Sequence, residues 1–156
     1  MNDKRIRIAV VAAELFEAAS AFLGAAGLVV GFMGIPLSIL SGTPFLDFTV
    51  PALLLGFVVG GSALVASIVT ALGLRPWDAL TSAAAGCITV GWLTIEIGMI
   101  GLGSWAQVAW LLVGMVMVVL GVLLWLAETH AAPMRPKPSI SPGELNCFCE
   151  AGRWLG

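Results

Sequence analysis

Long stretches of the chain contain no charged side chain, and several are long enough to cross a membrane. They cover residues 18–46, 48–74, 79–95 and 97–127. About 20 apolar residues in a helix span the roughly 30 Å of hydrocarbon in a bilayer. Glycine, proline and charged residues divide these stretches. The pattern predicts four membrane-spanning helices, near residues 6–33, 51–74, 78–101 and 105–128.

The composition supports this prediction. Of the 156 residues, 60% are apolar and 10% are charged, and the mean hydropathy is +1.05, whereas about a quarter of a soluble domain is charged. Short connections make consecutive helices antiparallel neighbours. We therefore expect an all-α, polytopic membrane protein in which residues 1–128 form an antiparallel four-helix transmembrane bundle. Residues 34–50 are expected to form a short helix and turn over one end, and residues 129–156 a proline-rich tail.

The basic residues predict the orientation of this bundle. They lie before the first apolar span, in the middle turn or in the tail, at Lys4, Arg5, Arg7, Arg75, Arg135, Lys137 and Arg153. The opposite connections, 34–50 and 102–104, carry none. The positive-inside rule then places both termini in the cytoplasm, and we expect the bundle to lie in the cell (inner) membrane, in contact with lipid. The net charge of −2 gives no indication of nucleic-acid binding.

Small residues at helical spacing predict where the helices meet. Helices in lipid associate through close packing and hydrogen bonds, because lipid offers no hydrophobic driving force between them. Each predicted helix carries such a face. The helix-packing residues predicted in this way are Gly24, Gly31, Gly56, Gly60, Ser67, Gly114 and Gly121.

Two glutamates lie inside the first predicted span. Glu14 and Glu17 each cost roughly 2.5–3.5 kcal/mol at bilayer depth on insertion scales. They share a face with small residues, so we expect them to point into protein. One interpretation is a proton or cation relay in which the two carboxyls share a proton. The other is a pair of hydrogen-bonded carboxyls that lock helix packing through hydroxyls such as Ser67 or Thr70.

A second polar group is predicted near the opposite end of the bundle. Glu96 lies in the third predicted span, Trp92 precedes it by one turn, and Gln107 begins the fourth span. With Asp47 of the first connection, they are candidates either for a ligand pocket or for a hydrogen-bond cluster. Glu96 lies about 10 Å from Glu17 in depth by helix rise, so no direct pair between them is expected.

Catalytic chemistry has little support in the sequence. There is no Ser-His-Asp set, phosphate-binding glycine loop or Cys-x-x-Cys motif, and the single histidine lies outside the predicted bundle. Cys147 and Cys149 are weak metal-ligand candidates, because a closed zinc site needs four ligands. We identify no cofactor, and the sequence favours a protein that is not an enzyme.

Four short segments resemble a known group of proteins. They are Gly-Ile-Pro-Leu-Ser-Ile-Leu at 34–40, Thr-Pro-Phe-Leu-Asp-Phe at 43–48, Pro-Ala-Leu-Leu-Leu-Gly at 51–56 and Gly-Trp-Leu-Thr-Ile-Glu at 91–96. In order and spacing they resemble small four-helix bacterial membrane proteins, often actinobacterial, that are broadly similar to the DoxX-like group. The resemblance covers about residues 8–102. It implies a four-helix fold, and some DoxX-like proteins accompany redox enzymes.

Three functional hypotheses follow. The first is a noncatalytic accessory or stabilising subunit of a larger membrane complex, with partner subunits or a homo-oligomer. The alternative is a small proton-coupled transporter or ligand carrier that uses the intramembrane glutamates. The third, a membrane subunit of a quinone-linked oxidoreductase, depends on the DoxX-like resemblance alone.

Overall fold

A computed structural model describes residues 3–32 and 34–131, and this part of the chain is all-helical, without strands. Its helices are α1 (Asp3–Val30), the 3₁₀-helix η1 (Leu37–Leu40), α2 (Thr49–Leu53), the π-helical segment η2 (Leu54–Gly60), α3 (Gly61–Leu72), α4 (Trp77–Ile100) and α5 (Trp105–Ala131). Because α2, η2 and α3 follow one another without a break, they form one rod. The predicted tail beyond residue 131, with Cys147 and Cys149, lies outside the described residues.

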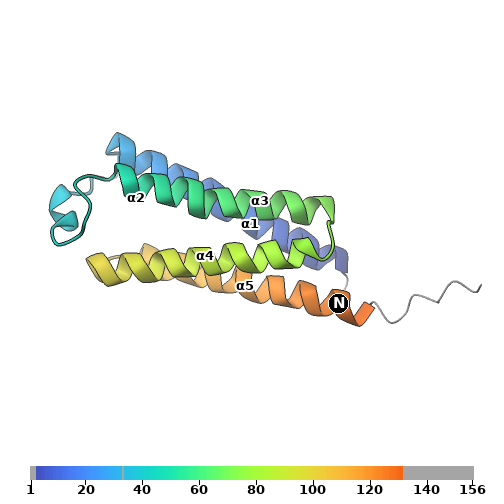
Figure 1. Cartoon of the computed structure of the whole chain (residues 1–156). Coiled ribbons are helices and arrows are strands. Elements are labelled where there is room, and N and C mark those ends of the chain that lie inside the picture. The colour runs from blue at the N-terminus through green and yellow to red at the C-terminus, as the bar shows by residue number, and fades with distance from the viewer. Residues whose placement is uncertain (1–2, 33, 132–156) are drawn as a thin grey trace, which may run out of the picture.

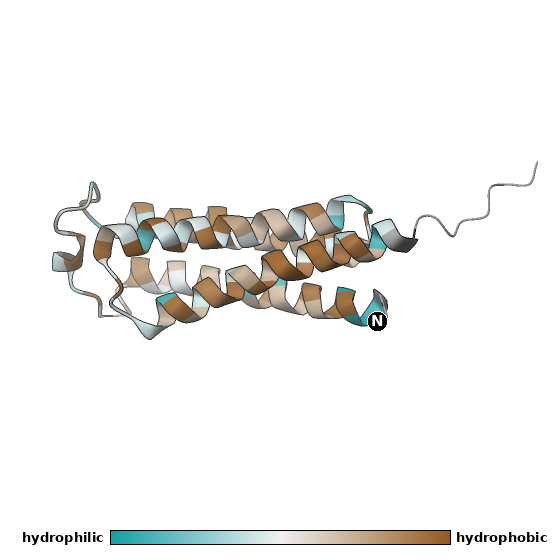
Figure 2. Ribbon diagram, turned by 90° about the horizontal axis from the view of Figure 1, so that it is seen from below, coloured by the Kyte–Doolittle hydropathy of each residue, from teal (hydrophilic) through white to brown (hydrophobic). Residues whose placement is uncertain are grey.

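Within the described residues, four helical segments are long and apolar enough to cross a membrane. They are Lys4–Val30, Thr49–Leu72, Trp77–Ile100 and Trp105–Thr129, and Figure 2 shows apolar residues along the length of the helices. The all-helical class and the four apolar helices are confirmed, with each helix boundary within three residues of its predicted position. Helix α1 begins at Asp3, three residues earlier than predicted, so Lys4 and Arg5 lie inside the helix together with Arg7.

The helices form two layers along a common direction (Figure 1). One layer holds α1 and the α2–η2–α3 rod, and the other holds α4 and α5. The start of α1, the turn at residues 73–76 and the end of α5 lie together, and we call this the N-terminal end. The connection at residues 31–48 and the turn at 101–104 lie at the opposite end, which we call the loop end.

Glycines bring α4 and α5 into close contact. A Cβ atom at Gly86 would lie 2.7 Å from the backbone nitrogen of Val118, and one at Gly121 would lie 2.7 Å from the backbone nitrogen of Ala83. A Cβ atom at Gly114 would lie 3.0 Å from Cγ2 of Thr89. Only glycine allows this approach, so these residues define a tight seam. The sequence pattern identified Gly114 and Gly121 but missed Gly86.

The other layer packs less tightly through the predicted small residues. A Cβ atom at Gly56 would lie 3.2 Å from Cβ of Ala25, and one at Gly60 would lie 3.2 Å from Cβ of Ala21. At Gly24 it would lie 3.2 Å from a methyl group of Leu55. These distances require small shifts of neighbouring side chains, and none of these contacts is as short as those at Gly86 and Gly121.

Gly31 was wrongly predicted as a helix-packing residue. Helix α1 ends at Val30, and Gly31 has a φ of +72°, in the left-handed region that commonly ends helices. A Cβ atom there would meet nothing within 4 Å. The residue therefore serves the turn into the connection and no helix interface.

Candidate functional site

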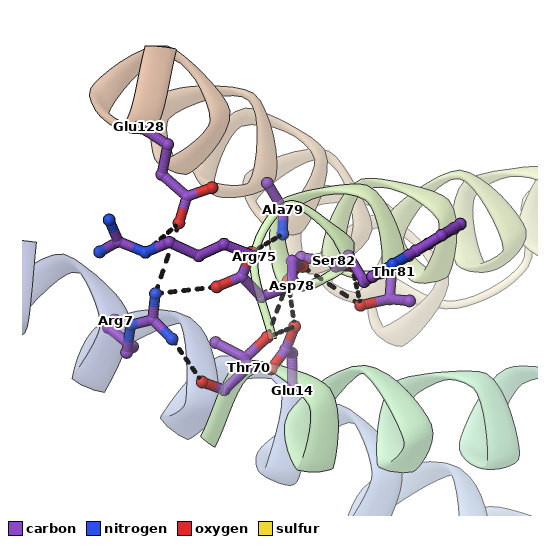
Figure 3. A network of polar contacts seen from close by, with 10 residues as sticks. Arg7, Glu14, Thr70, Arg75, Asp78, Ala79, Thr81, Ser82 and Glu128 are labelled. Carbon is purple, nitrogen blue, oxygen red and sulfur yellow. Dashed lines mark hydrogen bonds and ion pairs between the residues drawn. The ribbon is translucent and has the colours of Figure 1, made fainter. Parts of the chain in front are cut away.

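Glu14 lies fully buried in the interior, with 0% of its surface exposed. It projects from α1 towards α3 and α4, where its Oε1 atom is hydrogen-bonded to the Ser82 hydroxyl and lies 3.3 Å from Thr70 Oγ1 (Figure 3). The two hydroxyls also lie 3.2 Å from each other. This carboxyl thus joins three helices through one oxygen atom.

Glu17 lies one turn further along α1 and is 3% exposed. Its Oε1 atom is 3.2 Å from Thr89 Oγ1 on α4, so it has a different partner from Glu14. Of the two hydroxyls named from sequence, Thr70 does contact a glutamate, whereas Ser67 donates to the carbonyl of Leu64 in its own helix at 2.8 Å. In the described part of the chain, no hydrogen bond joins the two carboxyls directly.

Each glutamate keeps one oxygen atom without a partner. The Oε2 atoms of Glu14 and Glu17 are buried and accept no hydrogen bond from any described residue. Neither carboxyl takes part in an ion pair among the described residues. A buried polar atom without a partner is rare in folded proteins and calls for a chemical explanation.

A group of charged residues closes the N-terminal end of the bundle, and we call Arg7, Arg75, Asp78 and Glu128 the clasp. Arg7 Nη2 lies 2.8 Å from Asp78 Oδ2 and 3.4 Å from Glu128 Oε1. Arg75 Nε lies 2.9 Å from the same oxygen of Glu128 (Figure 3). Asp78 is fully buried, with 0% exposure, so its charge depends on the guanidinium of Arg7.

The clasp also reaches the end of α3, because Arg7 Nη1 donates to the carbonyl of Thr70 at 3.0 Å. Arg7 therefore connects all four spans. Sequence reasoning missed this group. The signals were an arginine within an apolar helix and an aspartate at the start of another. Their separation of 71 residues gave no means of pairing them.

The polar residues predicted for the opposite end come together only in part. Gln107 Nε2 donates to Glu96 Oε1 at 3.2 Å, while Gln107 Oε1 accepts from the backbone N–H groups of Gly103 and Ser104 at 3.0 and 3.2 Å. Asp47 instead accepts from the backbone N–H of Thr49 at 2.9 Å, in the connection. Of the four residues that the sequence grouped here, only Glu96 and Gln107 are hydrogen-bonded to each other in the described part of the chain.

Trp92 belongs to the same region of α4. Its indole nitrogen is buried and has no hydrogen-bond partner in the part of the chain that the structure describes. No hydrogen bond of the described residues links it to Glu96, which Gln107 binds instead. The structure therefore gives no common ligand-binding arrangement for the four residues that the sequence grouped here.

A lateral groove lies elsewhere, between the η2–α3 part of the rod and α4. It has a volume of about 290 Å³. One wall includes Phe57, Gly61 and Val65, and the other includes Thr81, Ala84 and Ile88. A Cβ atom at Gly61 would meet nothing within 4 Å. The sequence analysis did not predict this groove, because it arises where η2 packs only lightly against α4.

Metal binding finds no support in the described residues. They contain no group of three or more histidine, cysteine, aspartate or glutamate side chains that could hold an ion. The one cysteine among them, Cys87, is exposed on α4 as a free thiol. Cys147 and Cys149, the weak candidates from sequence, lie beyond residue 131, outside the described part.

Comparison with known proteins leaves the family open. No protein-family model matches this chain, and neither a curated protein nor a solved structure matches it. The geometry of the bundle is therefore the basis for a functional proposal.

Proposed function

We propose that this protein is a noncatalytic accessory subunit of a larger membrane complex, and that a transmembrane helix of a partner protein binds in the lateral groove. The observation that carries this proposal is the groove itself. It opens at the side of the bundle, between two helices that are apolar enough to span a membrane. Gly61 lies near the middle of its span, Thr49–Leu72, so the groove is reached from the hydrocarbon region.

The lining of the groove suits a helix better than a water-soluble ligand. Gly61, Ser62, Ala84 and Ala85 are small, and small residues allow the backbones of membrane helices to approach closely. Phe57 is 73% exposed and Val65 is 55% exposed, so larger apolar side chains stand beside them. A ridge of side chains on a partner helix fits a surface of this kind.

The interior supports a structural role for the bundle. Its buried hydroxyls and carboxyls join α1 to α3 and α4, and the clasp joins all four spans at one end. Hydrogen bonds between membrane helices stabilise them by about 0.6–2 kcal/mol each. A rigid bundle of this kind is suited to presenting a fixed side surface to a partner.

The proposal includes an orientation. Both termini lie in the cytoplasm, and the bundle lies in the bacterial inner membrane. Lys4, Arg5, Arg7 and Arg75 all belong to the N-terminal end, whereas residues 31–48 and 101–104 at the loop end contain no basic residue. This distribution supports a cytoplasmic N-terminal end by the positive-inside rule. The DoxX-like resemblance makes redox complexes the first class of partner to examine.

Filling the groove tests the proposal. Gly61→Phe adds a large side chain where a Cβ atom has open space, so the bundle should fold while the partner is excluded. Gly91→Phe is the matched control, because Gly91 is also a helical glycine with nothing within 4 Å of an added Cβ, but it does not line the groove. Each variant would be extracted from the native membrane in mild detergent and weighed by native mass spectrometry.

The expected result is a complex of defined stoichiometry for the wild type and Gly91→Phe, and its loss in Gly61→Phe. Ala84→Phe, on the opposite wall, should have the same effect as Gly61→Phe. Migration of the wild type alone or as a homo-oligomer would contradict the proposal. A complex that survives both groove substitutions would show that the partner binds elsewhere.

A further inference from the structure

The buried glutamates have a feature that an accessory role does not require. We propose that Glu14 and Glu17 each hold a proton in the folded bundle and together form an intramembrane proton-binding site. The proposal is independent of the partner-binding role, because the groove is lined by neither residue. It depends on burial, on the absence of a neighbouring cation and on the number of hydrogen atoms available in the hydrogen-bond network.

The hydrogen atoms of the network can be counted. A serine or threonine hydroxyl carries one hydrogen atom and therefore donates one hydrogen bond. Thr89 Oγ1 lies 3.2 Å from Glu17 Oε1 and also 3.1 Å from the carbonyl oxygen of Ala85. Two separate, unshared hydrogen bonds need a second hydrogen atom, and a protonated Glu17 supplies it. A carboxylic acid at Glu17 then donates to Thr89, which donates to Ala85.

Ser82 repeats this arrangement at Glu14. Its Oγ atom is hydrogen-bonded to Glu14 Oε1 and lies 2.8 Å from the carbonyl oxygen of Asp78. Again one hydroxyl hydrogen faces two acceptors, and a protonated Glu14 satisfies both contacts. Thr70, 3.2 Å from Ser82 Oγ, can donate to the remaining lone pair of that hydroxyl. Two carboxyls one turn apart thus have the same pattern with different partners.

The charged groups around the site do not neutralise it. From α1 the nearest cation is Arg7, which Asp78 and Glu128 already bind. Arg75, from the turn before α4, binds Glu128 of α5. Asp78 adds a negative charge, the α2–η2–α3 rod contains no charged residue, and neither glutamate joins an ion pair among the described residues. Two carboxylates buried here would stand without compensating charge, which is strongly unfavourable.

The free Oε2 atoms agree with protonation. Both are buried, and neither has a hydrogen-bond partner within residues 3–32 and 34–131. An ionised carboxyl spreads its negative charge over both oxygen atoms. An oxygen without a hydrogen bond would then carry half of that charge in the buried interior. In a carboxylic acid, the oxygen without a hydrogen bond carries no net charge, and leaving it unpartnered costs less. The ligand of this site is therefore a proton at each glutamate.

Infrared spectroscopy of the full chain in lipid bilayers at neutral pH tests the proposal, because a protonated carboxyl absorbs apart from a carboxylate. We expect Glu14→Gln and Glu17→Gln each to remove one carboxylic-acid absorption. Glu96→Gln is the control, since Glu96 is partly exposed and accepts a hydrogen bond from Gln107, and it should remove neither. If neither Glu14→Gln nor Glu17→Gln removes a carboxylic-acid absorption from the wild-type spectrum, the proposal is overturned.

Two further measurements cover misfolding and other cations. If a glutamine variant does not fold, Ser82→Ala and Thr89→Ala should shift the absorptions of Glu14 and Glu17 respectively, because each loses its hydroxyl partner. Unshifted absorptions in both would overturn the assignment. Replacing potassium by sodium in the buffer should leave the spectrum unchanged, and a sodium-dependent loss of the absorptions would show a metal-ion site in place of the proton site.

Discussion

The two ends of the bundle are held together in different ways. At the N-terminal end, Arg7 connects all four spans through Thr70, Asp78 and Glu128. At the loop end, the cross-link between long helices is the hydrogen bond from Gln107 to Glu96, which joins only α4 and α5. The difference teaches that the two layers of the bundle are fixed to each other at one end. The lateral groove lies between these two ends, along residues 57–65 of the rod and 81–88 of α4.

The largest effect is expected from breaking the clasp. Arg7→Met removes the partner of the fully buried Asp78 charge, and breaking a buried ion pair in this way costs about 3–5 kcal/mol. Unfolding of the purified variant in mixed micelles, by titration with a denaturing detergent, measures the loss of stability.

Arg5→Met is the matched control for the clasp. Arg5 is exposed and belongs to no ion pair among the residues that the structure describes, so its loss should change the free energy of unfolding by less than about 0.5 kcal/mol. Adding Asp78→Asn to Arg7→Met should recover part of the stability. Equal stability of the two methionine variants would mean that the clasp does not hold this end together.

A smaller effect is expected from replacing single glycines by alanine. Two such variants compare the tight seam with the groove. Gly121→Ala places a Cβ atom 2.7 Å from the backbone nitrogen of Ala83, so α4 and α5 must move apart. Overpacking of this kind costs about 1–3 kcal/mol. Gly61→Ala meets open space and should be neutral or stabilising by up to about 1 kcal/mol, because alanine favours helix more than glycine does.

The same unfolding assay compares these two alanine variants. Gly121→Ala should unfold at a lower concentration of denaturing detergent than the wild type, and Gly61→Ala should not. A loss of similar size in both variants would show that the groove is closed in the folded protein, and it would remove the difference between the two surfaces.

The smallest effect is expected at the loop end. Gln107→Ala removes the side chain that accepts from the Gly103 and Ser104 N–H groups and donates to Glu96. Residues 101–104 are exposed, so water can replace the lost contacts, and the net loss should be about 1 kcal/mol in total. Hydrogen exchange should increase in the turn at residues 101–104 while the clasp end stays protected. Faster exchange at Asp78 as well would contradict the independence of the two ends.

The sequence predicted the helices well because their signal is local. Apolar stretches between turn-forming residues determine the four spans, and small residues on the same face placed Glu14 and Glu17 inside the bundle. Contacts between helices depend on the rotation of each helix and on partners that are distant in sequence. For that reason Arg7 with Asp78, and Gly86 with Val118, could not be paired from the pattern.

The errors have the same origin. Gly31 fits the small-residue spacing of α1, but the helix ends one residue earlier. Asp47 was grouped with Glu96 because both were assigned to the loop end, whereas the fold uses Asp47 to bind the N–H of Thr49 within the connection. The groove was not predicted, since it results from the separation of η2 and α4 rather than from any one segment.

A photoreactive amino acid in the groove tests the proposed partner surface most directly. We would place it at Ser62, which lines the groove, and at Gly91, which does not, and irradiate cells that produce the full chain. The account predicts one cross-linked product of defined mass with another membrane protein at position 62, none at position 91, and loss of the product when Ala84→Phe is added. Lipid adducts alone at both positions, or a cross-link to a second copy of this chain, would contradict it.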